Sequence, residues 1–218
     1  RRLSSAASDV YKRQGNRIII GANGNNGSAP YSGHARVYDW DGSAWTQVGG
    51  DINGEAGSDY SGWKVAMNNA GNRVLVGAIY NTGNGYRAGH ARMFSHDGTN
   101  WVQMGSDIDG ENAEDEFSWS AAMNGAGSRV VISAYKNDGT GTNAGHTRIF
   151  EWDGTTWNQL GSDIDAEAAE DQAGYAVSMS DEGDRIAIGA NYNDGGGTNS
   201  GHVRIYDWNG SSLSLIHI

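Results

Sequence analysis

The chain has 218 residues and a formal net charge of -11, with 34 Gly, 1 Pro, 8 Trp, 10 Tyr and no Cys. The lack of cysteine excludes a disulfide scaffold and a cysteine-ligated zinc site, and no apolar run reaches the roughly 20 residues that a membrane-spanning helix needs. The acidic balance without a basic cluster argues against a nucleic-acid partner, because phosphate contacts need Lys and Arg.

The two ends of the chain differ in character from the rest. Asp9–Gln14 can be encoded by a stretch of DNA whose reverse complement encodes Leu213–Ile218. Two ends that translate one DNA stretch in opposite senses are typical of a sequencing adapter. We therefore predict that residues 1–14 and 213–218 derive from an adapter, that residues 15–212 are the genuine segment, and that neither natural terminus is present.

An internal repeat of 56 residues (34 to 90, 90 to 146, 146 to 202) organises the chain. The dipeptide Gly-His occurs four times at this spacing, and an Arg two residues after each His keeps the register. A fixed period in this range indicates a repeat architecture. The repeated positions are His34, His90, His146 and His202, followed by Arg36, Arg92, Arg148 and Arg204.

Each repeat predicts four short strands, because apolar residues alternate or run together with β-branched residues over strand-length segments. In the second repeat the expected strands are 61–67, 73–79, 90–95 and 101–108. No window shows a helical period. The sequence is therefore predicted to be all-β.

The connections alternate between tight and long. Asp-Gly or Asn-Gly pairs such as Asp97-Gly98 join the third and fourth strands, and this pair is a strong signal for a two-residue hairpin. Ala70-Gly71 and its equivalents join the first and second strands. Residues 81–88 and 51–59 form longer connections. Because strand direction alternates, both long loops should lie on one face, where function is expected.

Four-stranded antiparallel units at a regular period are typical of β-propeller blades. We expect an arc of about four blades, of which 61–116 and 117–172 are complete. Since propellers usually close with four to eight blades, the arc is expected to be part of a larger ring.

The repeat resembles the FG-GAP family, the repeat of integrin-α-type propellers. The motifs that carry the resemblance are Phe117-Ser118 where the family has Phe-Gly, Gly21-Ala22 and Gly77-Ala78 after the second strand, and the pattern of 33–38 on the third strand. It implies an extracellular or cell-surface adhesion protein. The calcium loop that integrin-type blades carry between strands one and two does not match 68–72, so that site is not expected here.

The residues singled out as candidate sites fall into three groups. The repeated His and Arg residues are expected to be structural, because a residue present in every blade is more often needed by the blade than by one site. Acidic clusters offer a weaker alternative, a calcium site, since hard cations bind several converging oxygens. These candidates are Asp107, Asp109, Glu111, Asp115, Asp163, Asp165 and Glu167. Tryptophans before the tight turns could stack on sugars, although packing against the next blade is the more common role. They are Trp40, Trp152 and Trp208.

These features predict a non-catalytic binding or adhesion module with a protein or glycan ligand on the long-loop face. No cysteine nucleophile, Gly-x-Ser-x-Gly elbow or phosphate loop is present, so no enzyme activity and no cofactor other than calcium are expected. Two alternatives stay open. One is a lectin-like propeller that uses the tryptophans, and the other is a scaffold within a secreted enzyme, which would need an irregular blade.

Overall fold

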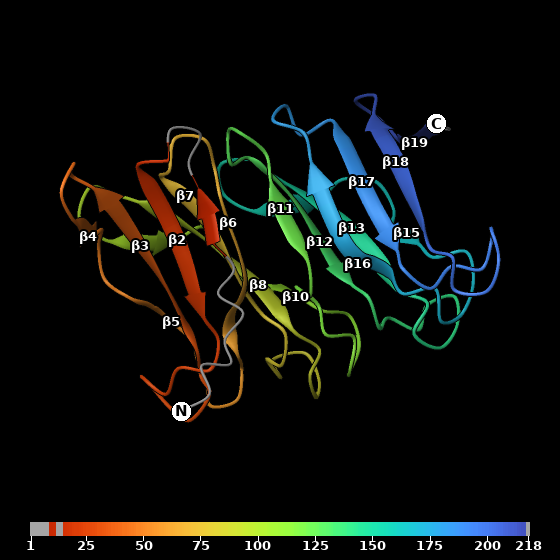
Figure 1. Ribbon diagram of the computed structural model, residues 1–218, viewed down its shortest axis with the longest axis horizontal. Coiled ribbons are helices and arrows are strands. Elements are labelled where there is room, and N and C mark those ends of the chain that lie inside the picture. The colour runs from red at the N-terminus through yellow and green to blue at the C-terminus, as the bar shows by residue number, and fades with distance from the viewer. Residues whose placement is uncertain (1–8, 12–14, 217–218) are drawn as a thin grey trace.

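The computed structural model of the chain describes residues 9–11 and 15–216 and is built entirely from β-strands. Its strands form four antiparallel sheets, which follow one another along the molecule in chain order (Figure 1). In these two segments there is no helix, and so none that is long and apolar enough to cross a membrane. The predicted all-β propeller arc is thereby confirmed.

The second blade shows how the repeat folds. Its strands are β6 (Ser61–Met67), β7 (Arg73–Ala78), β8 (His90–His96), β9 (Trp101–Gln103) and β10 (Ile108–Asp109). The first three agree with the predicted strands to within one residue at each end. The predicted fourth strand is wrong as a single element: Gly105 has a φ of 72°, which interrupts the ladder, and both β9 and β10 pair with β8.

The other blades repeat this arrangement with small changes. The first contains β1 (Asp9–Tyr11), β2 (Arg17–Ala22), β3 (His34–Trp40), β4 (Trp45–Gln47) and β5 (Ile52–Asn53). The third contains β11 (Ala121–Met123), β12 (Arg129–Ala134), β13 (His146–Trp152), β14 (Trp157–Gln159) and β15 (Ile164–Asp165). The fourth contains β16 (Ala173–Met179), β17 (Arg185–Ala190), β18 (His202–Trp208) and β19 (Leu213–Ile216).

Some residues predicted to be adapter-derived lie within the sheets. Asp9–Tyr11 pairs with β2, and Leu213–Ile216 pairs with β18 in the position of a fourth strand. The remainder of the predicted adapter segments, residues 1–8, 12–14 and 217–218, lies outside the described residues. The adapter origin of both ends stays a prediction.

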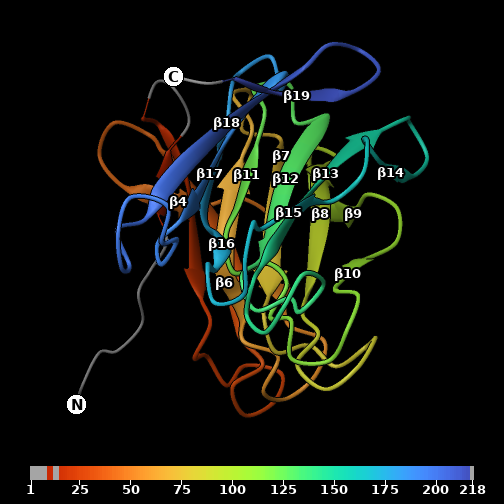
Figure 2. The same cartoon turned by 90° about the vertical axis from the view of Figure 1, so that its right-hand side faces the viewer.

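The hydrophobic core lies between blades. One cluster joins Leu75 and Met93 of the second blade to Phe117 and Ile132 of the third, and equivalent clusters fill the interfaces on either side. The first strands of neighbouring blades contact one another, β6 with β11 and β11 with β16, which places these strands at the inner edge of the arc. The long connections gather at one end of the sheets, at the bottom of Figure 2.

Candidate functional site

The repeated arginines connect each blade to the one before it. Arg92 donates from Nη2 to the carbonyl oxygen of Asn53 at 2.6 Å, and Arg148 does the same to Asp109 at 2.6 Å. Arg204 repeats the contact with Asp165. Arg36 instead pairs with Asp51 of its own blade at 2.7 Å. The arginine set therefore forms clamps between blades wherever a preceding blade is present.

The repeated histidines start the third strand of each blade. His34, His90 and His146 are buried, and the side chain of His202 is 26% exposed. Each imidazole faces carboxylates. Four of the calcium candidates therefore lie beside histidines: Asp107 near His90, Glu111 and Asp163 near His146, and Glu167 near His202.

The remaining calcium candidates have other surroundings. Asp115 is buried and accepts hydrogen bonds from the Asn112 backbone and the Asn137 amide, both at 3.0 Å. Burial raises the pKa of Asp109 and of Asp165. Asp107 and Glu111, four residues apart in the chain, belong to different blade interfaces.

The candidate tryptophans lie beside the tight turns, away from the long loops. Trp40 is 42% exposed and its ring lies 5.4 Å from that of Trp45. A Cβ placed on Gly105 would come within 2.9 Å of Trp152, so this ring packs on the preceding blade. Trp208 lies beside the equivalent glycine, Gly161, where a Cβ would be 3.5 Å from the Trp208 ring. Their role in ligand binding stays a prediction.

The third blade departs from the repeat at three neighbouring positions on the long-loop side. Glu116 stands where the flanking repeats have Tyr60 and Gln172. Lys136 replaces tyrosine, and Tyr135 replaces isoleucine or asparagine. The equivalent residues are Tyr80 and Tyr192 for Lys136, and Ile79 and Asn191 for Tyr135.

These three residues form one hydrogen-bonded group. Lys136 donates to Glu116 Oε1 at 2.8 Å, and the Tyr135 hydroxyl donates to Oε2 at 3.2 Å. Glu116 is only 3% exposed, whereas the Lys136 side chain is 36% exposed. A buried carboxylate thus holds a solvent-facing ammonium group in place.

The electrostatics fix the protonation of both partners of Glu116. Burial, followed by the negative charge of Glu116, raises the pKa of Tyr135 to about 12, so its hydroxyl remains a donor. Burial lowers the pKa of Lys136, but the hydrogen bond to Glu116 and its charge outweigh burial and give a net increase. Lys136 is therefore cationic at neutral pH.

An aromatic surface adjoins this group. Trp119 lies 4.3 Å from Tyr135, 5.0 Å from Trp63 and 5.7 Å from Tyr175, measured between ring centroids. Trp63, Trp119 and Tyr175 hold equivalent positions at the start of three inner strands. Tyr175 is 42% exposed. The Lys136 ammonium group therefore lies over the Tyr135 ring, which in turn packs against the rings of Trp119 and Tyr175.

The backbone at this site is irregular. β11 has three residues, whereas its equivalents β6 and β16 have seven. Ser118 replaces the glycines of the neighbouring blades yet keeps a φ of 74°, and its Oγ donates to the His90 carbonyl oxygen at 2.5 Å. A positive φ at a non-glycine residue costs about 1–3 kcal/mol and is concentrated at functional sites.

Sequence reasoning missed Glu116, Tyr135, Lys136 and Trp119 because it searched for residues that recur. A signal for the first three was present in the sequence: a carboxylate, a phenol and an ammonium group occur together in the third repeat at positions where the other repeats carry different residues. In a repeat protein, positions that recur mark the scaffold, and positions that vary between blades are where a site can be sought.

Comparison with known proteins supports the architecture. No protein-family model and no curated protein matches the chain. Among solved structures, a protein from Bacteroides uniformis described as a candidate 6-phosphogluconolactonase is similar with a TM-score of 0.62, at 10% identity over 96% of this chain and 52% of its own. The periplasmic gluconolactonase of Pseudomonas aeruginosa is similar with a TM-score of 0.63, at 10% identity over 100% of this chain and 58% of its own. The propeller domain of the Trilobed protease from Pyrococcus furiosus is similar with a TM-score of 0.53, at 11% identity over 95% of this chain and 56% of its own.

The chain spans about half the length of these structures, and at such identities the likeness shows the fold alone. The predictions of a non-catalytic adhesion or lectin-like module and of no enzyme activity are contradicted by this comparison. Two of the similar structures are described as lactonases. The reasoning failed because it took the FG-GAP resemblance as a guide to function, whereas one propeller fold carries many functions.

Proposed function

We propose that the chain is the propeller portion of a hydrolase that opens carbohydrate-derived lactones, with its site at Glu116, Tyr135 and Lys136. The observation that carries the proposal is the non-repeating carboxylate–ammonium–hydroxyl group in an irregular blade. The description of two similar folds as lactonases supports the class of substrate.

Lys136 is the group that would contact the substrate. Its exposed ammonium can donate to the carbonyl oxygen of a lactone and stabilise the negative charge that forms there when water adds. The ring C–O bond then breaks, and the proton from the water ends on the released ring oxygen as a hydroxyl group. Glu116 acts as a positioning residue, because it keeps Lys136 charged and fixed in direction.

The aromatic rings supply the binding surface. Sugar rings present C–H faces that pack on aromatic faces, and the rings of Trp119 and Tyr175 lie within 6 Å of each other and of Tyr135. Because Tyr135 stays protonated, it donates to the second oxygen of Glu116, and the Lys136 N–H groups that do not bond Oε1 can face the substrate.

The test is turnover of glucono-δ-lactone, followed by acid release against the spontaneous rate. We expect Lys136→Tyr, which restores the repeat residue, and Glu116→Gln, the residue of the fourth repeat, each to lower kcat/KM by about 10²-fold or more. Glu114→Gln alters an exposed carboxylate of the same loop and should keep the activity. Turnover no faster than the spontaneous rate, or unaffected by both site variants, would refute the proposal.

We also propose that the repeat is a divergent FG-GAP repeat and that the protein acts outside the cytoplasm. The motifs at 33–38 and 117–118 support the first statement. Sequencing the source locus across both ends tests both, since it shows whether further 56-residue repeats and a secretion signal are present.

A further inference from the structure

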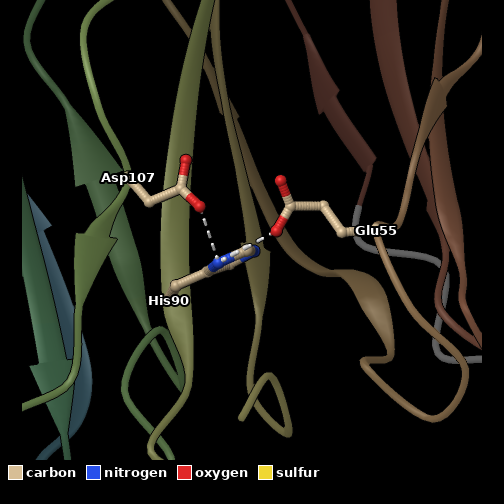
Figure 3. Close-up of side chains that lie close together, drawn as sticks. All are labelled: Glu55, His90 and Asp107. Carbon is tan, nitrogen blue, oxygen red and sulfur yellow. Dashed lines mark ion pairs between the residues drawn. The ribbon is translucent and has the colours of Figure 1, made fainter. Parts of the chain in front are cut away.

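Two blade interfaces contain the same group of one histidine and two carboxylates. At the first, Glu55 lies in the connection that leaves the first blade, and His90 and Asp107 belong to the second (Figure 3). At the second, the equivalent residues are Glu111, His146 and Asp163. In each group the candidate ligand atoms lie within 4.8 Å of one another.

The imidazole is buried and points between the carboxylates. His90 is 1% exposed, and neither of its ring nitrogens has a hydrogen-bond partner. His146 is equally buried, and its Nδ1 faces the two carboxylates of its own group. Buried polar groups are rarely left without a partner, because the cost is about 1–3 kcal/mol each.

The distances are longer than those of hydrogen bonds between charged partners. His90 Nδ1 lies 3.3 Å from Asp107 Oδ2 and 3.8 Å from Glu55 Oε2, and His146 Nδ1 lies 3.6 Å and 3.8 Å from its two carboxylates. A hydrogen bond between a charged pair spans about 2.7–2.9 Å.

The same distances do suit two ligands of one metal ion. Zinc binds nitrogen and oxygen at about 2.0–2.2 Å with tetrahedral angles, which places neighbouring ligand atoms about 3.3–3.6 Å apart. Figure 3 shows the His90 ring between the two side chains, with ion pairs to a carboxylate oxygen of Asp107 and of Glu55.

We propose that each of these two interfaces binds a divalent transition-metal ion, such as zinc, through His Nδ1 and the two carboxylates. Calcium fits poorly, because it takes oxygen ligands only. Since the glutamate comes from one blade and the other two ligands from the next, the ion joins adjacent blades in a chain that has no disulfide.

The arginine clamp complements this site. Arg92 lies 3.4 Å from Glu55 Oε1, so the other oxygen of this glutamate is the one that faces His90. Arg148 likewise lies 3.4 Å from Glu111 Oε1, and the other oxygen of Glu111 faces His146. The other two repeated histidines lack a complete set among the described residues: His34 faces Asp51, and His202 faces Glu167.

The experiment loads the 218-residue chain with zinc, removes the excess by dialysis and measures bound metal by mass spectrometry. We expect about two ions per chain, about one in His90→Gln, and none in His90→Gln/His146→Gln. His202→Gln is the matched control and should keep two. A chelator should lower the Tm of the loaded chain and leave that of the double variant unchanged.

Cobalt gives a second readout, since tetrahedral cobalt absorbs in the visible range. Asp107→Asn, which keeps the shape of the side chain, should remove about half of that absorption. If His90→Gln does not fold, Glu55→Gln at the exposed ligand replaces it. Zinc binding that persists in the double variant, the absence of zinc binding, or a Tm that responds to calcium alone would each overturn the proposal.

Discussion

The ionisation of Tyr135 depends on its position in the proposed site. Its hydroxyl lies between the protein interior and the carboxylate of Glu116, and both disfavour the phenolate. The folded protein therefore binds this proton more tightly than the unfolded chain. The stabilisation is complete below pH 10, the ordinary pKa, and is lost as the pH rises towards about 12.

We expect a titration followed by phenolate absorbance to show a tyrosine that ionises near pH 12, and Tyr135→Phe to remove it. Glu116→Gln should move the same transition to lower pH, because it removes the negative charge. A high-pH transition that survives Tyr135→Phe would show that this assignment is wrong.

The arginine clamps predict a difference between two residues at the same repeat position. Arg148 is buried and bonds the Asp109 carbonyl of the preceding blade, whereas Arg36 pairs with Asp51 near the surface. Lysine cannot reproduce the planar donor fork. We expect Arg148→Lys to lower the free energy of unfolding by about 2–4 kcal/mol, and Arg36→Lys by about 1 kcal/mol or less, measured by denaturant titration. Equal effects would show that the contact across the interface contributes little.

At the scale of the strand, the Gly of each Gly-His pair forms the entry to the third strand, and in the first three blades it touches the next blade. Gly89 has a φ of 78°, and a Cβ there would lie 2.3 Å from the Phe117 carbonyl oxygen. Gly201 has a similar φ of 68°, but no described residue of a following blade lies against it, and the nearest backbone atom to a Cβ there would be 3.1 Å away.

Alanine substitutions at Gly201 and at Gly89 separate the cost of the positive φ from the cost of a steric contact with the next blade. Gly201→Ala should cost about 1–2 kcal/mol for its positive φ alone, whereas Gly89→Ala should cost at least about 2 kcal/mol more, because backbone must move. Thermal unfolding of both variants measures this. A similar loss of Tm in both would mean that the backbone of the next blade adjusts easily.

At the scale of the whole molecule, the fourth blade exposes a face that the other blades cover. Val203 is 67% exposed, while the equivalent Ala35, Ala91 and Thr147 are fully buried. Beside it lies a shallow hollow lined by Tyr175, Ala176 and Gly189. Exposed apolar patches of this kind favour association.

We expect the chain to self-associate with increasing concentration, as measured by sedimentation velocity. Val203→Lys should shift the distribution towards monomer. Val102→Lys, on the exposed outer strand of the second blade, is the control and should have no effect. Association that is insensitive to Val203→Lys would place the contact elsewhere.

The sequence predicted the scaffold well, because period, turn chemistry and alternation are local signals. These signals predicted the first three strands of the second blade and the tight turns that join its strands. It could not predict the division of the fourth strand at Gly105, which depends on the ladder to β8, nor the group formed by Glu116 and Lys136. The latter residues are 20 positions apart and meet only because β12 lies beside the start of β11.

Around the apolar core, several polar contacts between blades end on backbone atoms. Arg92 and Arg148 donate to main-chain carbonyls, Trp101 and Trp157 donate from Nε1 to the carbonyls of Val48 and Met104, and Gly89 lies against the main chain of Phe117. Every residue type carries these atoms. A blade can therefore make these polar contacts with a neighbour whose polar side chains differ, as long as the apolar residues between the blades still pack. The repeat is thus a unit that gene duplication and unequal recombination can add or remove with few changes at the interface.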